Sequence, residues 1–308
     1  MRYEDMDWAE LELRSGLELV NITGGVVFLS RGGPTPSSDF TNSPGSNGVP
    51  YELLNSKEVN ERWPGFKVPN GIDAVYTADT GIVHASTCVT AMQYQARANG
   101  VILKEKTRTE MAIHISKGSY RAKKVTLAAD TWTNKLLGPL KSEIPVVTTM
   151  QEQVTYFKPS DPERYDPKSF PVWIWGGETV YYGFPTYGEP TIKAGRGVQQ
   201  NVMHPDHHTF VPSQEQPKKL TRFMDSIIPG HGPELRTVTC QYTITPDRQF
   251  IIGPLAKYPD VILALGNGHA FKFVPAIGRV VAELAIDGKT TDDISKFPMS
   301  SPTGSRKL

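Results

Sequence analysis

Apolar residues recur with helical spacing in four segments of the chain. These segments are residues 7–20, 86–99, 213–228 and 275–287. Ser86 is a suitable first cap for the second segment, because a serine side chain can accept a hydrogen bond from a free backbone N–H group. Gly100 and Gly288 follow the second and fourth segments, and glycine readily adopts the left-handed conformation that ends a helix. Pro275 suits a first helical turn, where its missing N–H is not needed. Four helices are therefore expected.

Most of the remaining apolar residues form short runs or alternate with polar ones, which predicts strands. The expected strands are residues 74–76, 81–83, 101–104, 111–116, 120–123, 125–129, 146–157, 179–184, 191–195, 236–243, 250–252 and 261–265. The segments 179–184 and 191–195 are expected to pair through the turn Gly188-Glu189-Pro190. Residues 32–48, rich in Gly, Ser, Pro and Asn, are expected to form a surface loop. This order predicts a mixed α/β chain with two interleaved lobes.

Composition and charge exclude several classes of function. The 308 residues contain 38% hydrophobic residues, enough for a core, and a net charge of +1 gives no general field for nucleic acid or an anionic membrane. Cys88 and Cys240 are far apart, so neither a disulfide framework nor a zinc site is expected. No apolar run approaches the roughly 20 residues of a membrane helix, and the start lacks a signal peptide, so a cytoplasmic location is expected. The C-terminal Arg306-Lys307-Leu308 approaches a peroxisomal signal and makes that compartment the alternative.

Two polar segments are candidates for chemistry. Residues 266–273, GNGHAFKF, lie between an expected strand and an expected helix and contain only the first half of a G-x-G-x-x-G motif. The segment is therefore either a tight turn or a site for an anion, which the helix start and Lys272 would both attract. Residues 204–208, HPDHH, are either a polar surface loop or a metal site, and no second cluster supports the metal. A G-x-S-x-G nucleophile motif is absent.

A resemblance extends over nearly the whole chain. The segments LRTVTCQYT at 235–243, TPDRQFII at 245–252 and GNGHAFKF closely resemble the sarcosine oxidase family of FAD-dependent amine oxidases. That family begins with a βαβ unit carrying G-x-G-x-x-G, so the chain resembles an N-terminally shortened member. The resemblance implies a glutathione-reductase-type FAD-binding fold that lacks this unit and is interleaved with an antiparallel substrate lobe. The substrate lobe is expected at residues 1–70 and 143–247, and the rest of the FAD lobe at 71–142 and 248–308.

The resemblance also implies roles for individual residues. Cys240 matches the cysteine joined covalently to FAD, Lys193 the lysine that promotes reaction with dioxygen, and Lys272 the lysine that binds the substrate carboxylate. Tyr182 matches an active-site tyrosine, and further residues match positions around the flavin and the substrate: Gly266, Gly268, His269 and Trp132.

The implied reaction oxidises a secondary amino acid, such as an N-methyl amino acid, to an imine that water hydrolyses, while dioxygen becomes hydrogen peroxide. The expected partners are this substrate and dioxygen, with no nucleic acid, membrane or metal. Two alternatives are a bulkier N-methyl or cyclic amino acid such as N-methyltryptophan or pipecolate, and a shortened, catalytically silent chain.

Overall fold

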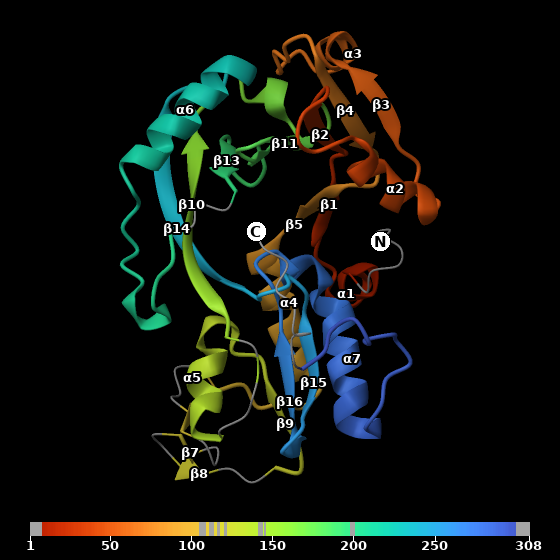
Figure 1. The fold of residues 1–308 in the computed structure, drawn as a ribbon, viewed down its shortest axis with the longest axis vertical. Coiled ribbons are helices and arrows are strands. Elements are labelled where there is room, and N and C mark those ends of the chain that lie inside the picture. Colours follow the sequence, from red (N-terminus) through yellow and green to blue (C-terminus); the bar gives the residue numbers. More distant parts are fainter. Residues whose placement is uncertain are drawn as a thin grey trace.

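The computed structural model describes residues 8–104, 109–110, 114–115, 118–119, 122–140, 144, 146–197 and 201–299. Within these residues, a large sheet lies at one end of the molecule, and smaller sheets with several helices lie at the other end (Figure 1). No helix in these ranges is both long and apolar enough to cross a bilayer. The C-terminal Arg306-Lys307-Leu308 lies outside them.

The large sheet has eight strands in the order β14-β10-β13-β12-β11-β2-β4-β3. In that order the strands are Glu234–Ile244, Thr148–Phe157, Ile192–Arg196, Tyr181–Phe184, Val172–Gly176, Gly25–Ser30, Ile72–Thr77 and Glu52–Asn55. All neighbours are antiparallel except β11 and β2. The hairpin of β12 and β13 is the one expected from the sequence. Strand β4 belongs to this sheet and begins at Ile72, just after residue 70, where the first part of the expected substrate lobe ends.

One face of this sheet carries the largest hydrophobic core. Helices α3 (Ser56–Arg62) and α6 (Glu215–Ile227) contribute Val59 and Met224 to it, and alternate residues of the strands contribute side chains such as Trp173. Helix α6 confirms the amphipathic helix expected at residues 213–228. Since strand side chains alternate between faces, the residues between these core positions point to the other face of the sheet.

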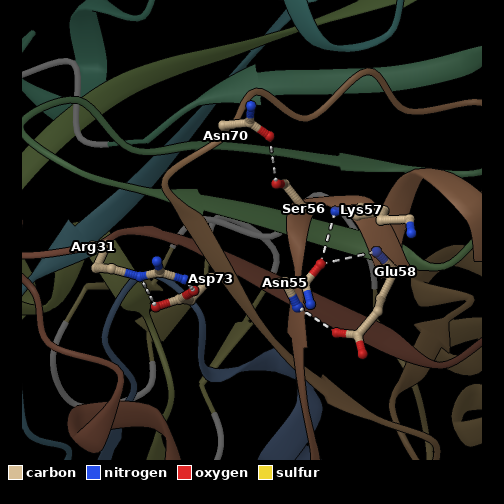
Figure 2. A network of polar contacts seen from close by, with 7 residues as sticks. All are labelled: Arg31, Asn55, Ser56, Lys57, Glu58, Asn70 and Asp73. Atoms are coloured by element: carbon tan, nitrogen blue, oxygen red, sulfur yellow. Dashed lines mark hydrogen bonds and ion pairs between the residues drawn. The ribbon is translucent and has the colours of Figure 1, made fainter.

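The start of α3 is fixed by a reciprocal set of hydrogen bonds (Figure 2). The Asn55 side chain accepts hydrogen bonds from the backbone N–H groups of Lys57 and Glu58, and the Glu58 carboxylate accepts one from the N–H of Asn55 at 2.7 Å. Directly after β2, Arg31 donates to Asp73 of β4 at 2.7 Å. These contacts hold the outer edge of the sheet, where Asn55 ends β3 and begins the helix.

A second group of elements forms the other end of the molecule. Strands β15 (Ile251–Leu255), β16 (Tyr258–Leu265) and β9 (Val125–Leu127) form a sheet in which β16 and β9 are parallel. Helix α7 (Val274–Asp287) packs on one face, and α5 (Thr133–Leu137) on the other. Helix α7 ends at Gly288 in the left-handed conformation, φ 72°, as expected from the sequence.

The smaller elements complete this end. Strands β1 (Val20–Ile22) and β5 (Gly81–Val83) pair, and helices α1 (Trp8–Ser15) and α4 (Ala85–Ala98) pack beside them. A three-stranded sheet contains β6 (Thr109–Glu110), β7 (His114–Ile115) and β8 (Gly118–Ser119). The strands expected at 111–116 and 120–123 fall partly outside the described residues.

Three local predictions were wrong. Residues 38–46 of the expected loop form helix α2 (Ser38–Ser46), in which Asp39 in the first turn favours the helix dipole and the backbone N–H of Asn47 closes the last turn. Helix α4 is preceded by His84, and Ser86 lies inside it. Residues 101–104 form no strand: the N–H of Val101 donates to the carbonyl of Ala96 and closes the helix, and no strand in the described part pairs with these residues.

Candidate active site

Lys193, Cys240 and Tyr182 come from three strands and share one face of the large sheet. Lys193 on β13 lies opposite Tyr156 of β10, and Cys240 on β14 lies opposite Glu152 of β10. Tyr156 and Glu152 are four residues apart on one strand, so their side chains and those of their partners point the same way. Tyr182 joins them, because it lies opposite Gly195, two residues after Lys193. This is the face that α3 and α6 do not cover.

The thiol and the ammonium group influence each other on this face. Burial lowers the pKa of Lys193, because loss of water disfavours the charged form, and the negative charge of a Cys240 thiolate opposes this. Burial raises the pKa of Cys240, the nearby Glu152 carboxylate raises it further, and Lys193 lowers it. The sheet therefore holds a thiol, an ammonium group and a carboxylate within electrostatic reach of one another.

The ring of Tyr182 lies over a glycine of the next strand. A Cβ atom at Gly195 would come within 2.7 Å of Cζ and Oη of Tyr182. Burial raises the pKa of the Tyr182 phenol, and Tyr242, Cys240 and Glu152 act in the same direction. The phenol is therefore neutral at physiological pH and remains available as a hydrogen-bond donor.

The segment 266–273 packs against the same strand that carries Cys240. Gly268 has φ +28°, and its N–H donates to the carbonyl of Thr243 on β14 at 2.8 Å. A Cβ atom at Gly268 would lie 3.0 Å from the ring of Tyr242, and one at Gly266 would lie 2.4 Å from the Cβ of Ala270. Both glycines are therefore required for the close turn that joins β16 to α7.

His269 and Lys272 follow in this segment, close to Tyr242. The rings of His269 and Tyr242 have centroids 5.7 Å apart. Burial lowers the pKa of His269, and the positive charges of Lys272 and Arg248 lower it further, so the imidazole is neutral at pH 7. Burial also lowers the pKa of Lys272, whose carbonyl accepts a hydrogen bond from the Trp8 indole at 3.0 Å. Tyr242 thus connects the loop residues with Cys240 and Tyr182.

Trp132 lies apart from these groups. Its side chain is 38% exposed, and its indole N–H donates to Asp206 at 2.9 Å. Its neighbour Asp130 accepts a hydrogen bond from the Thr243 hydroxyl, and Thr243 points to the opposite face of β14 from Cys240. The structure therefore places Lys193, Cys240 and Tyr182 on one sheet face, and Gly268 and His269 against Tyr242 of that face. Lys272 lies within electrostatic reach of His269, whereas Trp132 lies apart.

Side chains of the segment 204–208 contact other residues of the chain. Asp206 pairs with Lys135 at 2.5 Å in addition to its contact with Trp132, and His208 contacts the Thr239 hydroxyl at 3.1 Å. In the described part of the chain, no three His, Cys, Asp or Glu residues are grouped so that they could hold a metal ion.

Two further residues of this face were not selected from the sequence. Tyr242 follows Cys240 by two residues, so the alternation of β14 alone places both on one face. Glu152 is opposite Cys240 only through the register of β10 and β14, which the sequence does not reveal. The sequence therefore contained the pattern that places Tyr242 on this face, whereas no pattern in the sequence pointed to Glu152.

The groups on this face fit a flavin. The Cys240 thiol is exposed and available for a bond, and Lys193 lies on the same face. Helix α7 follows this loop with Pro275 in its first turn, and the positive end of its dipole favours an anionic ring there. The N–H of Val274 already donates to the carbonyl of Phe271. A thiol, two ammonium groups and the positive end of a helix dipole form a set of groups suited to a flavin ring and an anionic substrate.

Comparisons with known proteins identify the family. Residues 3–284 match the FAD dependent oxidoreductase family (DAO). The chain is 31% identical over 307 residues to monomeric sarcosine oxidase of Bacillus sp. (strain NS-129), a match covering 95% of this chain and 79% of that protein. It is 29% identical over 306 residues to N-methyl-L-tryptophan oxidase of Yersinia pestis (strain Pestoides F), with 95% and 80% covered.

A solved structure shows the same architecture. NikD, described as an unusual amino acid oxidase essential for nikkomycin biosynthesis, matches with a TM-score of 0.81 at 24% identity, covering 98% of this chain and 82% of that chain. This likeness confirms the mixed α/β fold expected from the sequence. The family match indicates FAD as the cofactor, and the chain belongs to the FAD dependent oxidoreductases.

Proposed function

We propose that the protein is an FAD-dependent oxidase of secondary amino acids, with N-methyl amino acids such as sarcosine as the first substrate class. The observation that carries this proposal is the shared face on which Lys193, Cys240 and Tyr182 meet, with Lys272 on the adjoining loop. FAD, when bound, accepts two electrons and a hydrogen from the amine and passes the electrons to dioxygen, which leaves as hydrogen peroxide.

Lys272 orients the substrate in this proposal. Its ammonium group binds the substrate carboxylate, and its partly buried position strengthens that attraction compared with water. Neutral His269 and the Tyr182 phenol offer hydrogen bonds beside it without adding a competing charge. The amino acid is thereby held by its carboxylate, with the amine carbon directed to the reacting face.

Lys193 serves the second half of the reaction. A half-buried ammonium group on the sheet face stabilises negative charge as dioxygen is reduced. Its ammonium group lies over Phe184, with Nζ 5.1 Å from the ring centroid, and this cation–π contact favours that position of the charge. The role follows from charge and position, and it requires Lys193 to stay protonated.

Cys240 forms a covalent bond to the flavin in this proposal. Joining a thiol to a methyl group of the ring system as a thioether removes two hydrogen atoms, which dioxygen accepts as hydrogen peroxide. The exposed thiol on the same face as Lys193 supports this assignment. A covalent link keeps the cofactor on the sheet even when other contacts are weak.

A bulkier substrate is the second candidate, favoured by apolar side chains on the same face. Ile174 lies opposite Tyr182 and is 39% exposed, and Val238, two residues before Cys240, is 40% exposed. Such side chains would bury an apolar substituent. N-methyltryptophan and pipecolate represent this class, and sarcosine represents the small one.

The test is an oxidase assay with the full chain after incubation with FAD. Hydrogen peroxide formation is measured with sarcosine, N-methyltryptophan, pipecolate and, as a primary amine control, glycine. We expect activity with at least one secondary amino acid and a much lower kcat/KM with glycine. Acid-precipitated protein should retain flavin absorbance, and Cys240→Ser should lose it.

The outcomes separate the alternatives. No peroxide with any of the three secondary amino acids, in protein that holds flavin, would reject the substrate class. No bound flavin under any condition would favour the catalytically silent chain instead. Activity with flavin that acid releases would reject only the covalent bond to Cys240.

A further inference from the structure

Glu152 is a buried carboxylate at the centre of the proposed site. Its side chain is 2% exposed, and it is the only Asp, Glu, Lys or Arg in the described ranges that is buried to this degree. Burying a carboxylate is costly unless the surroundings compensate. The reaction proposed above assigns it no part.

Glu152 lies next to the Cys240 thiol. Glu152 of β10 and Cys240 of β14 lie directly opposite in an antiparallel pair, where Cβ atoms are about 4.5–5.5 Å apart. Met150 and Val154, which share this face on either side of Glu152, are each 9% exposed and apolar. A buried carboxylate therefore lies beside a thiol that remains accessible from solvent.

The charge of Glu152 does not favour a thiolate by itself. As a fixed negative charge it raises the pKa of the Cys240 thiol, whereas Lys193 lowers it. Transfer of the thiol proton to the carboxylate differs from its loss to solvent, because the pair carries one negative charge both before and after the transfer. Burial opposes such a transfer less than it opposes a second negative charge beside the first.

We propose that Glu152 accepts the proton of the Cys240 thiol as the sulfur bonds to the flavin. This proposal rests on the covalent attachment proposed above. The S–H bond breaks and its proton passes to Glu152, while the sulfur forms a C–S bond to the methyl carbon. One C–H bond of that methyl group breaks and releases a second proton. The two electrons and two protons leave with dioxygen as hydrogen peroxide, so one thiol, one methyl group and one dioxygen give one thioether and one peroxide.

The proposal predicts two effects of opposite sign for Glu152→Gln. Without the negative charge, the pKa of Cys240 falls and the thiol reacts more readily with a small alkylating reagent. Without the proton acceptor, attachment of the flavin becomes slower. If Glu152 acted only through its charge, Glu152→Gln would make both alkylation and flavin attachment faster. If Glu152 served only the fold, Glu152→Gln would not change the two reactions in opposite directions.

The experiment measures both reactions on the full chain purified free of flavin. Iodoacetamide alkylation of Cys240 is followed by mass spectrometry as a function of pH, and Cys88, which is fully buried, serves as the unreactive internal reference. Attachment is followed as flavin absorbance retained after acid precipitation, at intervals after FAD is added in air. For Glu152→Gln we expect the alkylation midpoint at lower pH and attachment at least tenfold slower.

Two matched variants complete the design. Met150→Leu changes the same face of β10 at nearly constant volume and should attach flavin at the wild-type rate. Glu152→Asp keeps the charge but withdraws it by one carbon, so attachment should be intermediate. Circular dichroism and thermal unfolding establish that each variant is folded. If Glu152→Gln does not fold, Glu152→Asp decides, and attachment at the wild-type rate through the shortened side chain would overturn the proposal.

The remaining outcomes are distinct. Covalent flavin that forms in Glu152→Gln as fast as in the wild type, or faster, rejects the role of Glu152 and leaves the attachment to Cys240 intact. Flavin that never becomes covalent in the wild type rejects the attachment, and the role of Glu152 with it. In that case the oxidase reaction is still tested independently by peroxide formation.

Discussion

Gly195→Ala is the substitution whose effect can be worked out most directly from the geometry of the site. The added Cβ would lie 2.7 Å from Cζ and Oη of Tyr182. Carbon atoms in ordinary contact are about 3.5–4.0 Å apart, so the ring or the strand must move by about 1 Å. Gly195 does not have a positive φ, so the new side chain adds no backbone strain and the whole cost arises from lack of space.

The expected magnitude follows from this displacement. Overpacking of a close contact costs about 1–3 kcal/mol of unfolding free energy. A catalytic group misplaced by about 1 Å lowers the rate on the order of 10²-fold. Denaturant unfolding measures the first quantity, and kcat/KM for the oxidised amino acid measures the second. Both should fall together, because a single movement of Tyr182 causes both.

A double-mutant cycle identifies the cause. With Tyr182→Ala as the background, no ring opposes the new methyl group, and the stability cost of Gly195→Ala should shrink to below about 0.5 kcal/mol. If the cost stays the same in both backgrounds, Tyr182 is not the obstacle. If Gly195→Ala alone leaves the unfolding free energy and kcat/KM unchanged, the close contact between β13 and Tyr182 contributes to neither stability nor activity.

The remaining predictions concern the two lysines and the edge of the sheet. Lys193→Met should slow reoxidation by dioxygen far more than reduction by the amine in stopped-flow measurements, and equal slowing of both would reject its role. Lys272→Met should raise KM strongly with a smaller change in kcat. Because burial lowers the pKa of Lys272, the wild-type KM should rise with pH below the usual lysine range of about 10.5 as the ammonium group is lost, and this rise should be absent in the variant. Asn55→Ala should cost about 1 kcal/mol of unfolding free energy without changing kcat, and an unchanged denaturation midpoint would mean that the cap contributes nothing.

The sequence predicted elements whose signals are local. The amphipathic period of α6 and the proline and glycine that border α7 are contained within single segments, and both helices were found. Helix α2 was missed, because its Gly, Ser, Pro and Asn residues are more typical of loops. Local composition could not reveal that difference.

The site was predictable as a set of residue types and less so as an arrangement. The resemblance identified Cys240, Lys193 and Lys272, whereas no periodicity could show that β10 lies between β13 and β14 and brings their side chains together. Trp132 illustrates the limit, because its indole is turned toward Asp206 by contacts between segments about 70 residues apart. The roles of these residues stay predictions until the variants are measured.

The alternation of β10, β13 and β14 has a consequence for how such a chain can change in length. In each of these strands, alternate residues point to the proposed site and the residues between them point to the opposite face of the sheet. Insertion of one residue before Cys240 within β14 would turn the thiol to the opposite face of the sheet and place Thr239 or the inserted residue in its position. Single-residue length changes within these strands would therefore disrupt the site, whereas the turns between them can vary in length. Homologous and engineered chains should accordingly keep these three strands constant in length and concentrate insertions in the connecting loops.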